Sequence, residues 1–143
     1  CKPHGMPTDA SGRYAALYRP SHLIGLELSV SILNAALLGQ PTGATRAWRG
    51  DCVAVAKRAL TAGEMLDGEG GFTVYGKLIP ASRSLAEGAL PIGLAHGVKL
   101  KKNVAAGAIV RASDVALDEA ALAVRIRKEM EASAGDGALA AAQ

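Results

Sequence analysis

The sequence of 143 residues predicts an α+β fold, with a small β-structure between two helices. Three observations predict it: a stretch with helical spacing near the start, a run of short strand and turn segments with an internal repeat, and a charged helical stretch after them. The length allows one domain with a core of its own but is short for two. Because 50% of the residues are hydrophobic and only 3% are aromatic, that core must be built from aliphatic side chains.

The first helix is predicted over residues 21–38. Leucine and valine recur there at spacings of three and four residues, which is typical of a helix: Leu23, Leu26, Val30, Leu33 and Leu37. Pro20 keeps the preceding chain extended, and Ser21 is a suitable N-cap. Gly39 stands where a C-cap glycine is expected and Pro41 prevents continuation, so the helix should end just before this glycine.

The β-region contains a sequence repeat. KRALTAGEML at 57–66 and KKNVAAGAIV at 101–110 place two basic residues, an apolar residue, an Ala-Gly pair and an apolar end in the same order. Gly63 and Gly107 are 44 residues apart, at points where a turn with positive φ is expected. Each copy reads as a strand, a tight turn and a short return. A solenoid needs three or more copies, so two copies indicate a duplication inside one domain, with pseudo-symmetric arms.

Strand, turn and helix signals around the repeat complete the prediction. FTVYG at 72–76 reads as a strand after a glycine-rich turn. A Ser-Asp turn at 113–114 follows the second copy. Residues 118–132 read as a second helix with Asp118 as its cap and charges on one face. We expect the Ala- and Gly-rich tail at 133–143 to be frayed.

Charge and hydropathy argue against two classes of protein. The formal net charge is +3 and the basic residues are scattered, whereas a nucleic-acid binder concentrates basic charge and interleaves aromatics, so we predict no nucleic-acid partner. The most apolar run, residues 23–39, is interrupted by Glu27, two serines and Asn34, so we predict no membrane span. The polar start does not read as a signal peptide. Since the chain begins with Cys1 rather than Met, we expect it to be a fragment.

The sequence holds no motif of its own for cofactor or metal chemistry. No G-x-G-x-x-G unit follows a strand and opens a helix, and Gly68–Gly71 precedes a strand and fits a turn better. P-loop, H-E-x-x-H and serine-nucleophile motifs are absent. Cys1 and Cys52 lack C-x-x-C spacing, which leaves either a disulfide or, as we favour, reduced thiols. Three histidines lack the spacing of a metal site: His4, His22 and His96.

One short segment combines side chains that suit an anionic ligand. YRPSH at 18–22 places the Tyr18 phenol, the Arg19 guanidinium and the His22 imidazole around Pro20, at the entry to the predicted helix. A helix N-terminus attracts anions, and Arg19 offers a fork suited to phosphate or carboxylate. Two interpretations stay open, a substrate-binding loop or an interface in which Arg19 is a surface cation. His22 is a weak candidate for a general base, and the catalytic residues are otherwise unknown.

The repeat and its surroundings resemble a known module. AKRALTAGEMLDGEGG at 56–71 and GLAHGVKLKKNVAAGAIVRASDVAL at 93–117 are similar to SAF domains. These are β-clip folds found in sialic-acid synthases, altronate dehydratases and flagellar or pilus assembly proteins. The resemblance covers about residues 52–117. It implies a SAF-type β-clip with an internal strand-turn-strand duplication, preceded by one helix and followed by a C-terminal helix.

A wider pattern extends the resemblance in both directions. YRPSHLIGLE, a connector, VAVAKRALTAGEMLDGEGGFTVYGKL, PIGLAHGVKLKKNV and the charged terminal helix follow in order. This order resembles the C-terminal portion of homoserine-dehydrogenase-like, SAF-containing NAD(P)-dependent oxidoreductases, including type II deoxyxylulose-phosphate-reductoisomerase-like enzymes. It implies that residues 1–50 end a catalytic domain, that residues 51–132 form a SAF-like domain with its terminal helix, and that residues 133–143 are a flexible tail.

The resemblance also implies a function for the complete protein. NAD(P) would be bound by an upstream Rossmann domain that is absent from this chain, so the fragment alone is expected to be inactive. The substrate would be a small polyol, sugar acid or sugar phosphate, and the most specific reaction implied is reductoisomerase-like. Arg19 and the start of the helix would hold its anionic group, and Tyr18 and His22 would bind its hydroxyls. Pro20 would also belong to the substrate-binding loop. The enzyme would be cytoplasmic, would contain an upstream catalytic domain, and could form a homo-oligomer.

Two other functions compete with this one. The first is a free-standing SAF or β-clip module that binds or assembles with a partner without catalysis. The second is a purely structural domain with no residue in an active site. The predicted helix at 21–38 and the YRPSH segment favour the oxidoreductase, because a free-standing module has no need of them.

Overall fold

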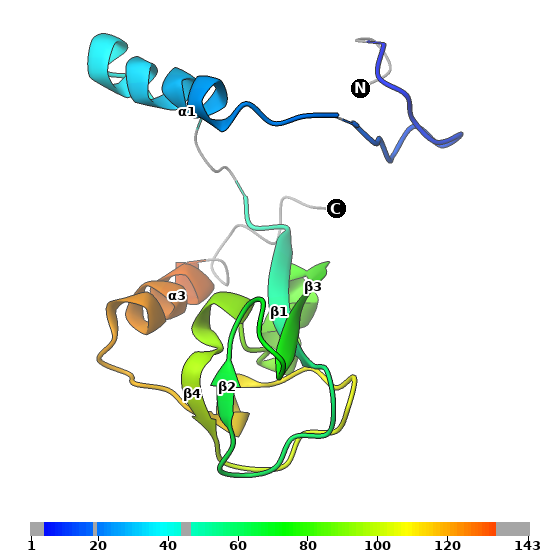
Figure 1. Ribbon diagram of the computed structural model, residues 1–143, viewed down its shortest axis with the longest axis vertical. Helices are drawn as coiled ribbons and strands as arrows, with labels where there is room; N and C mark the ends of the chain where they lie inside the picture. The colour runs from blue at the N-terminus through cyan, green and yellow to red at the C-terminus, as the bar shows by residue number, and fades with distance from the viewer. Residues whose placement is uncertain (1–4, 19, 44–46, 134–143) are drawn as a thin grey trace. The chain divides into compact units, whose positions relative to one another are not determined.

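The computed structural model describes residues 5–18, 20–43 and 47–133 (Figure 1). The chain divides into two compact units, Cys1–Ala44 and Thr45–Gln143, and each is described by itself. The predicted α+β fold is confirmed, since the second unit contains antiparallel sheets and the chain has a helix before and a helix after them.

The first unit contains helix α1, Ile24–Leu33, which continues as a π-helical turn over Asn34–Leu38. The predicted start of this helix at Ser21 is wrong. The N–H groups three and four residues after Leu23 both donate to the Leu23 carbonyl at 2.9 Å, so Leu23 takes the N-cap position. The predicted end is confirmed, because Gly39 takes a φ of 61° as the C-cap.

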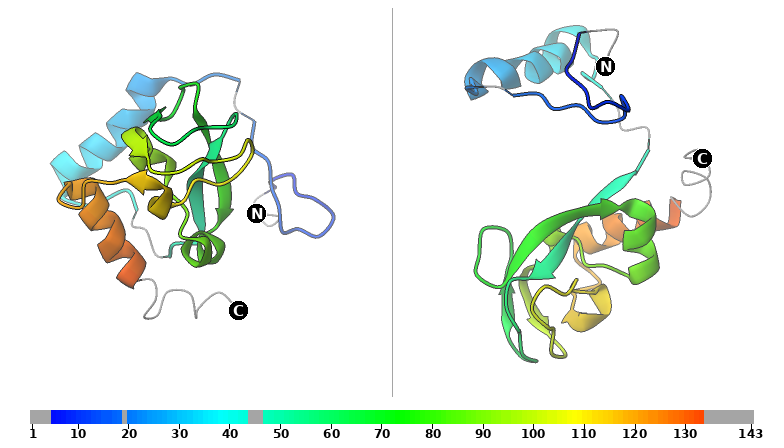
Figure 2. Two further views of the ribbon diagram at one scale, coloured as in Figure 1. Left: turned by 90° about the horizontal axis from the view of Figure 1, so that it is seen from below. Right: turned by 90° about the vertical axis from the view of Figure 1, so that its right-hand side faces the viewer.

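Two small antiparallel sheets form the second unit, and Figure 2 shows them from two further sides. In one sheet, β1 (Gly50–Ala56) pairs along its length with β3 (Val74–Pro80). In the other, β4 (His96–Leu100) lies between β2 (Met65–Asp67) and β5 (Val115–Ala116).

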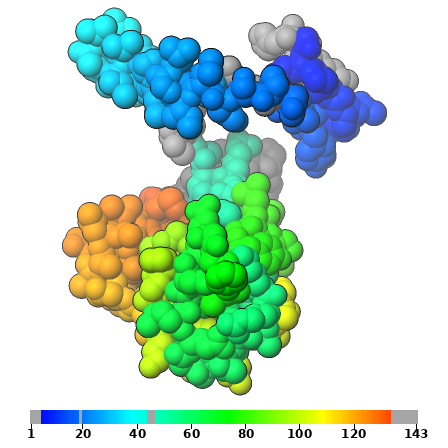
Figure 3. All heavy atoms as spheres, in the orientation of Figure 1, coloured from blue at the N-terminus to red at the C-terminus, as the bar shows by residue number. Residues whose placement is uncertain are grey.

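Helical segments connect and cover these sheets. Helix α2, Ala81–Glu87, follows β3 directly, and 3-10 turns occur at Ile92–Leu94 and Ala112–Asp114. Helix α3, Leu122–Ser133, forms one side of the second unit (orange in Figure 3). It begins four residues later than predicted, because Asp118 caps a preceding turn instead. The Asp118 side chain accepts a hydrogen bond from the N–H of Ala120 at 3.0 Å.

The two repeats pair with each other through equivalent backbone hydrogen bonds. The N–H of Gly63 donates to the carbonyl of Leu100 at 2.8 Å. The N–H of Gly107 donates to the carbonyl of Ala56, also at 2.8 Å. Leu100 follows Ala56 by the same 44 residues that separate the glycines, so the repeat relates one bond to the other. Figure 1 shows the two loops, green and yellow, running side by side.

Leu60 and Val104, which are also 44 residues apart, exchange both of their backbone hydrogen bonds at 2.9 Å. The return strand β2, at the end of the first copy, pairs with β4, which directly precedes the second copy. The predicted pairing within each copy is therefore wrong. The eight residues 57–64 between β1 and β2 are too many for a two-residue hairpin turn, and their backbone groups find partners in the other copy.

The core of the second unit is aliphatic, as the composition predicts, and it follows the repeat. Equivalent positions of the two copies are buried together, each at most 6% exposed: Ala56 with Leu100, Leu60 with Val104, and Leu66 with Val110. Burial of a leucine or valine side chain stabilises a fold by about 1.5–3 kcal/mol. The duplication thus supplies matching apolar groups to a single core.

A buried ion pair ties α3 to the β1–β3 sheet. Arg127 donates to both carboxylate oxygens of Asp51, at 3.1 and 2.6 Å, and Ser84 donates to the same group at 2.5 Å. The guanidinium also lies 4.5 Å from the centre of the Trp48 ring, a cation–π contact. Burial alone would raise the pKa of Asp51, but the hydrogen bonds from Arg127 and Ser84 outweigh it and lower the pKa. Asp51 therefore stays ionised and binds the helix.

Replacing Gly63 or Gly107 by alanine should destabilise the second unit by similar amounts. Their φ values of 92° and 75° would place a Cβ in the left-handed region, at a cost of about 1–2 kcal/mol. Gly93→Ala is the matched control, because Gly93 has no positive φ and a Cβ there meets nothing within 4 Å. Urea unfolding followed by fluorescence of the single tryptophan measures the changes. Destabilisation by only one of the two variants would contradict the equivalence of the turns.

Arg127→Met should lower the free energy of unfolding by about 3 kcal/mol, because it leaves the Asp51 carboxylate buried without its cation. Arg83→Met is the control. Its pair with Glu87, at 2.6 Å, lies on an exposed face of α2, where such pairs contribute about 0.5 kcal/mol. Chemical unfolding monitored by circular dichroism compares the two variants. Equal losses would show that the buried pair does not anchor α3.

Candidate functional site

The predicted YRPSH segment lies in the first unit, just before α1. Tyr18 is 86% exposed, Pro20 and His22 are also exposed, and Arg19 lies outside the described residues. The His22 Nδ1 is 3.5 Å from a carboxylate oxygen of Glu27, in the first turn of α1. The structure therefore leaves the Tyr18 and His22 side chains accessible, and their role in binding a substrate stays a prediction.

The structure describes one further histidine, His96, and one cysteine, Cys52. His96 is the first residue of β4, and its Nδ1 lies 3.0 Å from the carbonyl oxygen of Asp67. His4 and Cys1 lie outside the described residues. Cys52 is an exposed free thiol. The described ranges contain no group of three or more metal-ligating side chains.

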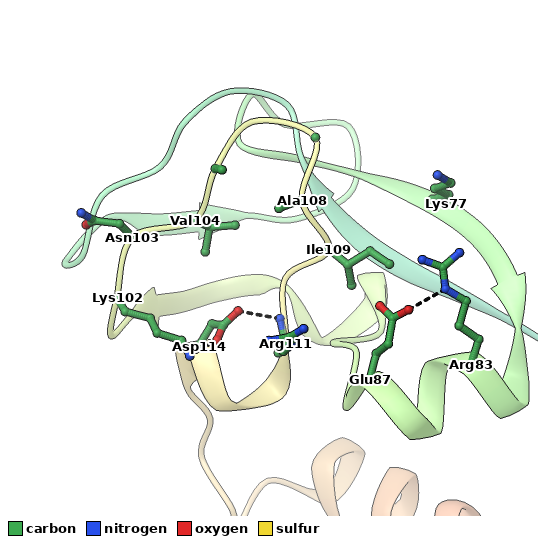
Figure 4. A pocket seen from close by; sticks show the side chains of 12 residues that line it. Lys77, Arg83, Glu87, Lys102, Asn103, Val104, Ala108, Ile109, Arg111 and Asp114 are labelled. Carbon is green, nitrogen blue, oxygen red and sulfur yellow. Dashed lines mark hydrogen bonds and ion pairs between the residues drawn. The ribbon is translucent and has the colours of Figure 1, made fainter.

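The second unit has an open groove of about 450 Å³ beside the second repeat (Figure 4). Residues 102–109 form one wall, β3 contributes Lys77 and α2 contributes Arg83. In Figure 4, these two cations lie at one end of the groove and Lys102 lies at the other, with the apolar side chain of Ile109 between them. The groove is therefore lined by both basic and apolar side chains.

The two carboxylates that line the groove are already paired. Arg83 Nε lies 2.6 Å from Glu87 Oε1, and Lys102 Nζ lies 2.8 Å from Asp114 Oδ1. Burial alone would raise the pKa of Asp114, but hydrogen bonds from Lys102 and the Arg111 N–H outweigh it and lower the pKa. Each of the two carboxylates therefore neutralises a neighbouring cation of the groove rather than repelling an anionic ligand.

Lys77 and Arg111 carry the unpaired charges of the groove. Both residues are exposed, and neither has an acidic partner in the part of the chain that the structure describes. The backbone at both positions is fixed. Lys77 faces Val53 across the β1–β3 ladder, and the Arg111 N–H donates to Asp114 at 2.9 Å. Cations on a fixed backbone beside an apolar wall favour an oxyanion with a carbon skeleton.

The first repeat carries acids where the second repeat does not. Glu64 corresponds to Ala108, and Asp67 corresponds to Arg111, each 44 residues apart. The prediction from sequence used the turns of the repeat but did not compare its charges, so it missed this groove. An alignment of the two arms, residues 57–70 and 101–114, shows Ala108, Arg111 and Ser113 in the places of Glu64, Asp67 and Glu69, and Asp114 in the place of Gly70.

The acidic side chains of the first arm, Glu64 and Asp67, accept hydrogen bonds from residues of their own loop. Glu64 accepts a hydrogen bond from Arg58 at 2.8 Å, which together with bonds from Thr61 lowers its pKa to about 2. Asp67 accepts hydrogen bonds from the Thr73 hydroxyl and, at 2.5 Å, from the Phe72 N–H, and these lower its pKa to about 2. The acids of the first arm are therefore bound internally. On the second arm, Lys102 pairs with Asp114, whereas Arg111 has no acidic partner among the described residues.

Comparison with known families identifies the fold of the second unit. Residues 53–116 match the sequence model of the SAF domain. The chain contains a SAF domain. The matched span agrees with the one expected from resemblance, about residues 52–117, and it includes both repeats. No curated protein matches the chain.

Among the helices of the described residues, none has the length and apolar character needed to cross a membrane.

The acids of the first arm predict a loss of stability at low pH. Glu64 and Asp67 have ordinary pKa values of 4.5 and 3.8, and the folded state lowers both to about 2. Their stabilising effect is present above the ordinary pKa values and is lost as the pH falls through them towards 2. The free energy of unfolding should therefore fall over this range.

Asp67→Asn should reduce that pH dependence, because the amide keeps a hydrogen-bond acceptor but does not titrate. Glu69→Gln is the matched control in the same loop, since Glu69 has no ion pair or hydrogen bond among the described residues. Urea unfolding at several pH values between about 7 and 2 measures the slopes. The same slope in Asp67→Asn and in the unaltered chain would contradict the role of Asp67.

Proposed function

We propose that this SAF domain is the C-terminal domain of a cytoplasmic NAD(P)-dependent oxidoreductase that acts on a small polyol, sugar acid or sugar phosphate. The observation that supports it is the apolar surface of α1, which follows the YRPSH segment. Two stripes of this helical region are more than half exposed: Ile24, Leu28 and Ile32 on one, and Val30, Leu33 and Leu37 on the other. A helix with apolar side chains on several faces normally lies inside a larger core. The catalytic domain of such an enzyme would provide that core.

The nicotinamide cofactor would bind outside the described residues. The glycine-rich loop at 68–71 is a poor fit for a dinucleotide, because the Asp67 carboxylate occupies the space beside Gly71. A Cβ at Gly71 would lie only 2.1 Å from the Asp67 Cγ. A carboxylate in this position repels phosphate. The SAF domain would therefore shape or cover the substrate pocket and leave the hydride chemistry to other domains.

The YRPSH segment would supply substrate contacts in this enzyme. Arg19 would hold an anionic group through a charge-assisted pair, and the exposed Tyr18 and His22 would bind hydroxyl groups. A reductoisomerase-like reaction on a sugar phosphate is the most specific form of this proposal. The complete enzyme could also form a homo-oligomer.

Two measurements test the proposal. The first reads the coding DNA upstream of Cys1, where a strand, a G-x-G-x-x-G motif and a helix are expected in frame. The second assays the complete gene product for oxidation of NAD(P)H. Arg19→Ala and His22→Ala should each lower kcat/KM by about tenfold to a hundredfold, the usual effect of losing a hydrogen bond to a charged group.

Arg13→Ala is the control, since it removes an exposed arginine from the same unit. A frame without a dinucleotide motif, or a gene product that does not turn over NAD(P)H, would contradict the oxidoreductase. Unchanged kinetics in the Arg19 and His22 variants would make the segment structural.

A free-standing binding module is the second candidate function, and the basic groove favours it because the groove is complete within the second unit.

A further inference from the structure

We propose that the groove beside the second repeat binds a small organic oxyanion, a carboxylate or a phosphate monoester, with Lys77 and Arg111 as its direct contacts. This site is separate from the YRPSH segment and does not rest on the oxidoreductase proposal. Its lining residues all belong to the second unit, which contains the SAF domain.

The balance of charge in the groove favours an anion. Four cations and two carboxylates line it, and each carboxylate binds one cation: Arg83 with Glu87, and Lys102 with Asp114. Lys77 and Arg111 remain without an acidic partner among the described residues. Arg111 presents a planar fork that can bind an oxyanion through two hydrogen bonds, while Lys77 supplies a point charge.

The duplication provides an independent argument. The two arms share their turns, their buried positions and their reciprocal backbone bonds, but they differ in charge at the groove. On the first arm, Glu64 lies where the second arm has Ala108, and it neutralises Arg58. The cation that corresponds to Arg58 is Lys102, which pairs with Asp114. Arg111, in the place of Asp67, is therefore the charge that the second arm leaves without an acidic partner among the described residues.

The size and walls of the groove indicate a small molecule with some carbon skeleton. A volume of about 450 Å³ lies within the range of about 300–1,000 Å³ that is typical of small-molecule sites. Val104, Ala108 and Ile109 give one wall an apolar character, and a Cβ added to Gly107 would meet nothing within 4 Å. The hollow is therefore open to a ligand on this side. Free inorganic phosphate could use the two cations but not the apolar wall.

The test is a titration of the 143-residue chain with two probes, glycerol 2-phosphate and glutarate, at constant ionic strength, followed by backbone amide shifts in NMR. At least one probe should shift the amides of residues 105–111 in a saturable way. Lys77→Ala and Arg111→Ala should each raise Kd about tenfold or more. Ala108→Glu should have the same effect, because it places an acid beside Lys102 as Glu64 lies beside Arg58. The preferred probe then tells phosphate from carboxylate.

Lys99→Ala and Arg125→Ala are the controls, because each removes one exposed charge of the same unit outside the groove. They should change Kd by less than about twofold. The absence of saturable shifts with both probes up to about 10 mM would overturn the proposal. Equal effects of groove and control variants would also overturn it. The proposal would also be overturned if the chain bound single-stranded DNA and the groove and control variants weakened that binding equally. The net charge of the whole unit, rather than the groove, would then explain anion binding.

Discussion

The second unit depends on the reciprocal backbone pairing of its two repeats. Its strands are short, and each repeat contains a loop whose N–H and C=O groups need partners. Leu60 and Val104 satisfy each other, and the turn glycines Gly63 and Gly107 donate to equivalent carbonyls of the opposite copy. The same relation brings matched aliphatic side chains into one core. A single constraint therefore determines the turns, the strand pairing and the buried surface.

The two copies differ at several positions outside the shared core, and the candidate site lies beside some of these positions. The first arm uses Glu64 and Asp67 to bind its own loop, with both pKa values lowered to about 2. The second arm has Ala108 and Arg111 at those positions, and Arg111 lines an open groove. Both arms therefore have the same backbone arrangement, although their charges differ. The shared backbone bonds hold the two copies together, and the proposed ligand contact Arg111 lies at a position where the copies differ.

Local features of the fold could be predicted from the sequence because they depend on neighbouring residues. The turn at Gly63, the helix end at Gly39 and the aliphatic core are examples. Strand pairing could not be predicted in the same way, since a periodic pattern identifies a strand but not its partner. The groove could not be predicted for a similar reason, because Lys77 and Arg111 are far apart in the sequence and line one groove only in the folded unit.

The two candidate sites differ in what they need from the rest of the protein. The YRPSH segment precedes a helix with apolar side chains on several faces, and such a helix needs a larger core to be buried. The groove needs nothing further, because its cations and its apolar wall lie in the SAF-containing unit. An oxyanion site complete in that unit would serve an enzyme and a binding module equally well. Ligand binding by the groove would therefore describe this SAF domain whichever protein it serves, whereas the chemistry of the complete protein depends on the residues around α1.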